Sequence, residues 1–176
     1  MRRTFGLLLL ILPALVQPAN AFDRVELVRT YVDRIVANSL DEPDGHQAYF
    51  TEIQLLNDFG ADFVSAYTKA LNAARMRREV SLFEEDPMTG DANRCPIGKV
   101  HIADLSRPDT RIMVEARLDL PSCDDGAGGG SQTRLMFILL ADDAAGKRFV
   151  IDDVLRERAD GDWFSLRAAL ESRADP

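Results

Sequence analysis

The hydrophobic pattern of this chain changes its period partway along, and the change limits the folds open to it. Between residues 23 and 77 apolar side chains recur every three or four positions, which is typical of amphipathic helices. Beyond residue 99 the pattern alternates, most strictly in the segment 111–120, where apolar residues stand at Ile112, Val114, Ala116, Leu118 and Leu120. Helices followed by consecutive strands predict an α+β domain with an antiparallel sheet, and not a series of βαβ units.

The same patterns place each expected element along the chain. Helices are expected at 23–37, 47–59, 62–77 (with Asp62 as its N-cap) and 165–172, a short strand at 80–82, and longer strands at 99–105, 111–120, 133–141 and 147–155. The chain therefore opens with helices and closes with one short helix after the sheet.

The amino terminus has the three regions of a secretory signal peptide. Residues 1–3 are positively charged, residues 5–16 are almost wholly apolar, and residues 18–21 are small. A buried amphipathic helix does not explain this segment, because the apolar run has no polar side. We expect cleavage between Ala21 and Phe22, which leaves a periplasmic or secreted protein.

Size and charge exclude several classes of protein. The remainder, 22–176, has the length of a single domain, and 46% hydrophobic with 28% charged residues is ordinary for a globular protein. Losing Arg2 and Arg3 with the leader changes the net charge from −8 to −10. A surface with this much negative charge repels the phosphate groups of nucleic acids, and we therefore do not expect the protein to bind DNA or RNA. Nothing after the leader reaches about 18 consecutive apolar residues, so we expect no transmembrane segment in the mature protein.

Two cysteines, Cys95 and Cys123, flank a predicted hairpin. Paired positions in an antiparallel hairpin have a constant sum of residue numbers, and the cysteines sum to 218, as do Ser106 and Ile112 at the turn. An even number of cysteines in an exported chain also favours a disulfide. Two free thiols or a metal pair are the alternatives, although a metal site requires more ligands than the chain offers here.

An acidic pair, Asp152 and Asp153, lies inside the last long predicted strand. Strand alternation sends the two carboxylates to opposite faces, so they cannot share a proton. Asp153 would then share the apolar face with Ile151 and Leu155. A buried carboxylate needs a partner. Asp153 either binds a backbone amide or an arginine at a strand bulge, or it forms the polar floor of a ligand cavity.

Three tyrosines lie on the predicted helices and supply the polar groups that a pocket would use. Large aromatic residues at helical spacing are usually core residues. A subset of them can also line a pocket and present hydroxyl groups to a ligand. The candidates are Tyr31, Tyr49 and Tyr67.

Motifs of known catalytic and metal sites are missing from the sequence. The run Gly128–Ser131 lacks the second glycine of a nucleophile elbow, and no glycine loop carries a phosphate-binding lysine. The acidic break at 41–45 lacks the glutamate of a calcium loop. We therefore expect no metal, no cofactor and no assignable catalytic residue.

Two short motifs resemble a bacterial exported family, domain-of-unknown-function family 3828. They are Phe149–Val154 followed by Ser165–Arg167, and the loop Asp86–Thr89, which is similar to the family's Asp-Pro-aromatic-Thr loop. The sequence departs from the family at Ala92–Asn93, where a Gln-Asp pair would stand. The resemblance implies a curved, cone-like sheet of the cystatin-like or nuclear-transport-factor-2-like group. With Asp153 and the three tyrosines, Asp86 completes the candidate pocket residues.

Three classes of function agree with these observations. The first is a non-catalytic exported domain that binds an envelope protein or a small apolar ligand, with inhibition or buffering of an envelope partner as a special case. The second is a small isomerase or dehydratase acting on a hydrophobic carbonyl compound, which requires an aspartate base beside tyrosine hydroxyls. The third is a structural or accessory subunit.

Export gives the first testable prediction. Protein recovered from the periplasm or the medium should begin at Phe22, because the leader carries a complete cleavage signal. Amino-terminal sequencing or intact mass measurement checks this. Exported protein that still carries Met1 would contradict the prediction.

Overall fold

The structure is a computed structural model that describes residues 24–40, 46–90, 96–107, 111–120, 131–142 and 148–175. Its described part is an α+β domain, as predicted, in which three helices precede an antiparallel sheet and one short helix follows it. The elements are α1 (Arg24–Ser39), α2 (Glu52–Asp58), α3 (Ala61–Arg77), β1 (Val100–Asp104), β2 (Ile112–Leu120), β3 (Ser131–Ala141), β4 (Phe149–Glu157), β5 (Trp163–Ser165) and α4 (Leu166–Ala174). The expected signal peptide lies outside the described residues.

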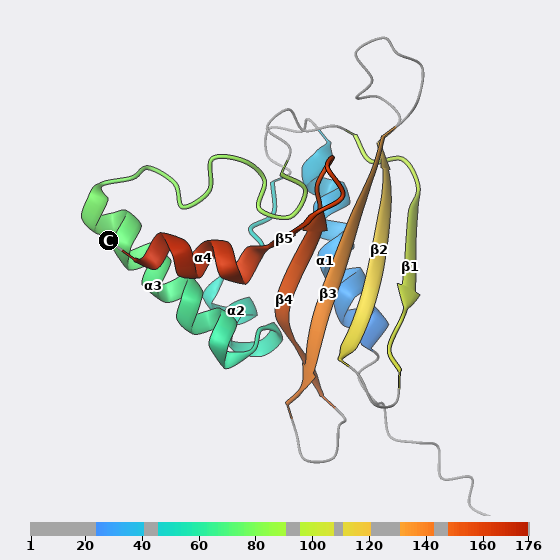
Figure 1. Ribbon diagram of the computed structural model, residues 1–176, viewed down its shortest axis with the longest axis horizontal. Coiled ribbons are helices and arrows are strands. Elements are labelled where there is room, and N and C mark those ends of the chain that lie inside the picture. Colours follow the sequence, from blue (N-terminus) through green and yellow to red (C-terminus); the bar gives the residue numbers. More distant parts are fainter. Residues whose placement is uncertain are drawn as a thin grey trace, which may run out of the picture.

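The five strands form one meander in the order β1-β2-β3-β4-β5. Helix α1 lies behind the sheet against β1 and β2, whereas α3 and α4 pack against each other beside β4 (Figure 1). None of the described helices combines the length and the apolar character needed to cross a membrane.

The hydrophobic core lies between α1, α3 and one face of the sheet. The strict alternation of β2 is confirmed, since Val114, Ala116 and Leu118 are fully buried on the inner face. From the helices, Tyr31 and Phe63 are the largest fully buried side chains. Strands β2, β3 and β4 therefore each contribute one apolar face to the core.

Several helix and strand boundaries differ from the expected ones for local reasons. Helix α2 begins at Glu52 because Thr51 and Gln54 form a capping box, so residues 47–50 are not helical. The N-cap of α3 is Gly60, and Asp62 lies in the first turn, where the helix dipole favours a carboxylate. The strand expected at 80–82 is a loop, and β5 was not predicted.

The register of the β1–β2 hairpin matches the one derived from the sequence. Val100 pairs with Leu118 and Asp104 with Val114, and both pairs sum to 218. The Lys99 carbonyl also accepts a hydrogen bond of 2.9 Å from the Asp119 amide. Cys95 and Cys123 lie outside the described residues, so their disulfide stays a prediction.

Strand β4 contains a β-bulge that the alternation rule did not foresee. Against β3, Asp153 pairs with Ile138 and Ile151 with Leu139, so Asp152 is an extra residue without a partner. Beyond the bulge the facing of the strand is reversed. Val154 is therefore the residue that joins Ile151 on the inner face, and the expectation that Asp153 shares the face of Ile151 is wrong.

Asp153 caps helix α4 from the neighbouring strand. Its Oδ1 accepts hydrogen bonds from the backbone amides of Val154 (2.8 Å) and Arg167 (2.9 Å), and its Oδ2 accepts one from the Ser165 hydroxyl (2.6 Å). Ser165 is itself the N-cap of α4 and accepts a hydrogen bond from the Ala168 amide. Asp153 is 7% exposed, and its carboxylate accepts hydrogen bonds from backbone amides. Of the two alternatives considered for Asp153, this is the one in which the carboxylate binds the backbone at a strand bulge.

The hairpin register leads to a prediction about the cysteines. Denatured, unreduced mature protein should show no free thiol, and reduction should destabilise it by roughly 3–4 kcal/mol on the chain-entropy estimate. Thiol labelling and urea unfolding with and without reductant measure both effects. A Cys95→Ser/Cys123→Ser double variant should be insensitive to reductant, and labelling of both cysteines in the native sequence would refute the bond.

The cap on α4 leads to a second prediction. Asp153→Ala should lower the free energy of unfolding by roughly 1–3 kcal/mol, because it strands the buried donors that the carboxylate accepts from. Asp152→Ala is the matched control. The Asp152→Ala substitution should lower the free energy of unfolding by less. Burial raises the pKa of the Asp152 carboxyl despite its ion pair with Arg167, which means that the protein stabilises the charged form of Asp152 only weakly. Urea unfolding compares the two variants, and equal losses would contradict the capping role.

Candidate functional site

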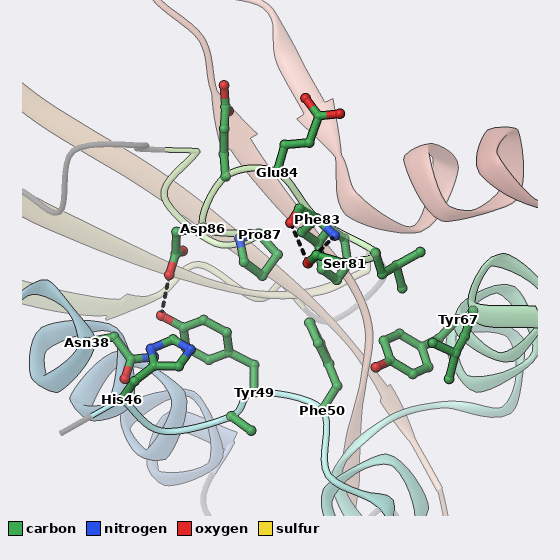
Figure 2. A pocket seen from close by; sticks show the side chains of 14 residues that line it. Asn38, His46, Tyr49, Phe50, Tyr67, Ser81, Phe83, Glu84, Asp86 and Pro87 are labelled. Carbon is green, nitrogen blue, oxygen red and sulfur yellow. Dashed lines mark hydrogen bonds between the residues drawn. The ribbon is translucent and has the colours of Figure 1, made fainter. Parts of the chain in front are cut away.

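The described residues form a half-open cleft of about 550 Å³, which we call the Tyr49 cleft. It lies where the segment after α1, the middle of α3 and the loop before β1 meet (Figure 2). Its lining residues are Asn38, His46, Ala48, Tyr49, Phe50, Tyr67, Leu71, Ser81, Leu82, Phe83, Glu84, Glu85, Asp86 and Pro87. It is large enough for a small organic ligand.

One wall of the cleft is held in place by Asn38 at the end of α1. The Asn38 side-chain amide donates to the carbonyl of Gln47 (2.9 Å), and its Oδ1 accepts from the Gln47 amide (2.6 Å). A buried side chain thus satisfies both backbone groups of Gln47, which fixes a non-helical segment where the sequence predicted a helix. Tyr49 and Phe50 follow directly and are thereby positioned in the cleft.

The floor of the cleft is aromatic, and Phe50 is at its centre. The Phe50 ring contacts Tyr67 with ring centroids 5.2 Å apart, Phe83 at 5.9 Å and Phe63 at 5.8 Å. Tyr67 extends from α3 toward Phe50 (Figure 2). The Tyr67 hydroxyl has no hydrogen-bond partner among the residues that the structure describes, so it is available to a ligand.

The opposite wall is a turn organised by the Asp86 carboxylate. Its Oδ1 accepts hydrogen bonds from the backbone amides of Met88 (2.9 Å) and Thr89 (2.8 Å), which is the pattern of an Asx turn. Its Oδ2 accepts a hydrogen bond of 2.8 Å from the Tyr49 hydroxyl, drawn as a dashed line in Figure 2. The Tyr49–Asp86 pair thus joins the two walls across the cleft.

The turn ends at Gly90, whose φ of +68° lies in the left-handed region that glycine adopts without strain. A Cβ at this position would also overlap the guanidinium of Arg156 from β4. The turn is therefore held from one side by Tyr49 and packed on the other side by Arg156.

Burial changes the acidity of the tyrosines. Desolvation raises the pKa of Tyr49 well above its ordinary value, and the Asp86 carboxylate raises it further. Desolvation and Asp58 act in the same way on the pKa of Tyr31. Both hydroxyls therefore keep their protons and act as hydrogen-bond donors to a carboxylate.

The structure brings three of the five candidate pocket residues together, namely Tyr49, Tyr67 and Asp86. Tyr31 is a fully buried core residue whose hydroxyl donates to Asp58 (2.9 Å). Asp153 caps α4 and does not line the cleft. The two residues left out are thus both engaged in holding the fold.

The geometry of the cleft suits binding better than acid–base chemistry. The Asp86 carboxylate accepts three hydrogen bonds, one of them from Tyr49, so neither group is free to act on a substrate. No hydrogen bond among the described residues joins His46 to Ser81, whose hydroxyl donates to the carbonyl of Phe83. In the described part of the chain, no three His, Cys, Asp or Glu side chains are placed to hold a metal ion.

Sequence reasoning missed Asn38, His46 and the loop residues Ser81–Glu85 as parts of this site. An asparagine just after the predicted helix was the available signal for Asn38, since this side chain commonly forms hydrogen bonds with nearby backbone groups. The loop residues gave no signal, because their place in the cleft depends on tertiary packing of the Asp86 turn.

Comparison with known proteins yielded no match among family models, curated proteins or solved structures.

The buried tyrosines predict a loss of stability in alkali. Below pH 10 the phenols keep their protons in the folded and the unfolded state, so they add no pH dependence. Above pH 10 the unfolded chain ionises while the folded chain, with its raised pKa values, does not, so stability falls as pH rises, by up to about 1.4 kcal/mol per pH unit for each tyrosine.

Urea unfolding between pH 9 and pH 11 measures this slope. Above pH 10, the free energy of unfolding of a Tyr49→Phe variant should fall less steeply with pH than that of the native protein, because one ionisable phenol is removed. At pH 7 the variant should lose only the hydrogen bond to Asp86, which is worth roughly 1 kcal/mol. An unchanged slope in Tyr49→Phe would contradict the assignment.

Proposed function

We propose that the chain is an exported, non-catalytic binding domain whose ligand is a small apolar molecule held in the Tyr49 cleft. The observation that carries the proposal is the cleft itself, a cavity of about 550 Å³ floored by Phe50, Tyr67 and Phe83. Pockets of this size with aromatic linings and a few polar groups are typical of small-ligand sites. The leader supports the part of the proposal that concerns export. The resemblance of the Asp86 loop to the exported family 3828 supports the same part.

Three polar groups of the cleft, those of Tyr49, Tyr67 and Asp86, have different roles. The Tyr49–Asp86 pair is engaged within the protein and supports the wall. The Tyr67 hydroxyl lies in the cleft without a partner among the described residues, and it donates a hydrogen bond to an acceptor on the ligand. The favoured ligand is therefore apolar over most of its surface and carries a single acceptor group.

Binding is favoured over the isomerase or dehydratase alternative by the state of the carboxylates. That chemistry needs an aspartate carboxylate that is free to take a proton from the reacting carbon. Tyr49 donates its proton to Asp86, and both oxygens of Asp153 are taken by the cap of α4.

The proposal is tested by titration with the uncharged fluorescent probe N-phenyl-1-naphthylamine. Its fluorescence should rise and saturate with the mature protein, because the aromatic cleft removes the probe from water. Ala48→Trp places a large side chain in the cleft from an exposed position and should weaken binding about tenfold or more.

Ala168→Trp is the matched control, since Ala168 is equally an exposed alanine but lies on α4 outside the cleft. It should bind the probe as the native protein does. Equal binding by the two tryptophan variants, or no saturable binding, would overturn the small-ligand proposal and leave a protein partner as the better explanation.

A further inference from the structure

A second cavity shares the loop Leu82–Pro87 with the Tyr49 cleft. It has a volume of about 250 Å³, and β4, β5 and α4 supply the rest of its lining. The apolar lining residues are Leu82, Phe83, Pro87, Phe164, Leu166 and Ala169, and the charged ones are Glu84, Glu85, Asp86, Arg156 and Arg173. We call it the Arg156 pocket.

Arg156 differs from the other charged residues that are buried in this lining. Arg173 donates to the carbonyl of Leu82 (2.5 Å) and lies 3.4 Å from a carboxylate oxygen of Glu79, and Asp86 holds its turn. The Arg156 guanidinium is half-buried, yet it has neither a hydrogen bond nor an ion pair with any residue that the structure describes. A partly desolvated charge in that state is costly until it finds a partner.

A second guanidinium lies close to the first. Arg156 lies over the ring of Phe164 at 4.8 Å from its centroid, and Arg158 lies over the same ring at 5.3 Å. Burial lowers the pKa of Arg156, and the neighbouring charge of Arg158 lowers it further. Glu85 and Asp86 attract Arg156 from a distance, but no hydrogen bond joins them to it.

The overall charge of the chain makes this arrangement informative. The chain has 29 acidic residues and 21 basic ones, so its carboxylates outnumber its lysine and arginine side chains. On the outer face of the sheet, for example, Arg134 forms ion pairs with two carboxylates, those of Glu115 and Glu157. Neither Arg156 nor Arg158 has a carboxylate partner among the residues that the structure describes. Arg156 lines an apolar cavity, where an external anion would supply the missing charge.

We propose that the Arg156 pocket binds a small monocarboxylate with an apolar body. The carboxylate accepts hydrogen bonds from the Arg156 guanidinium, whose planar fork matches a carboxylate in a two-point contact. The apolar body lies against Leu82, Phe164 and Leu166. Glu84 and Glu85 in the same lining repel a second negative charge, so a monoanion is preferred to a dianion.

Isothermal titration of the mature protein with 4-phenylbutyrate tests the proposal, with 4-phenylbutanamide as the uncharged ligand of the same shape. The acid should bind roughly tenfold or more tightly than the amide, since only the acid pairs with Arg156. Equal affinity of acid and amide, or no binding of the acid at millimolar concentration, overturns the proposal. This comparison needs no variant and therefore does not depend on how a substitution folds.

Variants then assign the charge to Arg156. Arg156→Met keeps an unbranched apolar stem over Phe164 and should reduce the affinity for the acid to that for the amide. Arg29→Met, at an exposed arginine of α1 whose ion pair with Glu26 is long (3.7 Å), should leave the affinity for the acid unchanged. Native affinity for the acid in a folded Arg156→Met protein overturns the assignment.

This inference is independent of the proposed function and fails separately from it. Ala48→Trp blocks the Tyr49 cleft and should leave 4-phenylbutyrate binding intact, because Ala48 does not line the Arg156 pocket. If the two probes compete for one site, the assignment of two pockets is wrong.

Discussion

One extra residue in β4 sets the direction of every side chain that follows it. Without the bulge at Asp152, alternation from Ile151 would place Asp153 and Leu155 on the inner face and send Arg156 outward. With the bulge, Val154 enters the core opposite Phe137, and Arg156 follows on the same face opposite Leu135. The bulge therefore both completes the core and brings a guanidinium to the edge of the cavity beside α4.

The same shift gives Asp153 its structural role. On the outer face the carboxylate reaches the start of α4, where it accepts hydrogen bonds from Ser165 and the Arg167 amide. A helix of only nine residues has little stability of its own, so its N-terminus depends on such partners. The strand, its bulge and the last helix are thus one unit, and α4 in turn supplies Leu166 and Leu170 to the core.

The sequence was sufficient where local periodicity decides the structure. The alternation of β2 and the sum rule for the hairpin predicted the β1–β2 register residue by residue, because turn position and strand period together leave no freedom. Sequence reasoning named a strand bulge only as one possible setting of Asp153 and did not locate it. The run 150–155 is apolar at Val150, Ile151, Val154 and Leu155, so it does not show where the phase of the alternation changes. The wrong prediction for the face of Asp153 follows from that one unpaired residue. For the same reason, alternation from Ile151 would not place Arg156 on the inner face.

The candidate sites were harder to predict, because they meet at a segment without regular secondary structure. Leu82–Pro87 lines both cavities, and the Asp86 side chain fixes it by hydrogen bonds to the amides of its own turn and to the hydroxyl of Tyr49, 37 residues earlier in the chain. A sequence motif can identify the turn, as the Asp-Pro dipeptide did, but it carries no information about which segment of the chain supplies the tyrosine. Arg156 then packs against the end of that turn at Gly90, where a side chain would leave no room for the guanidinium. The two cavities therefore share one wall, and a substitution that loosens the Asp86 turn acts on both, whereas Ala48 lines only the Tyr49 cleft.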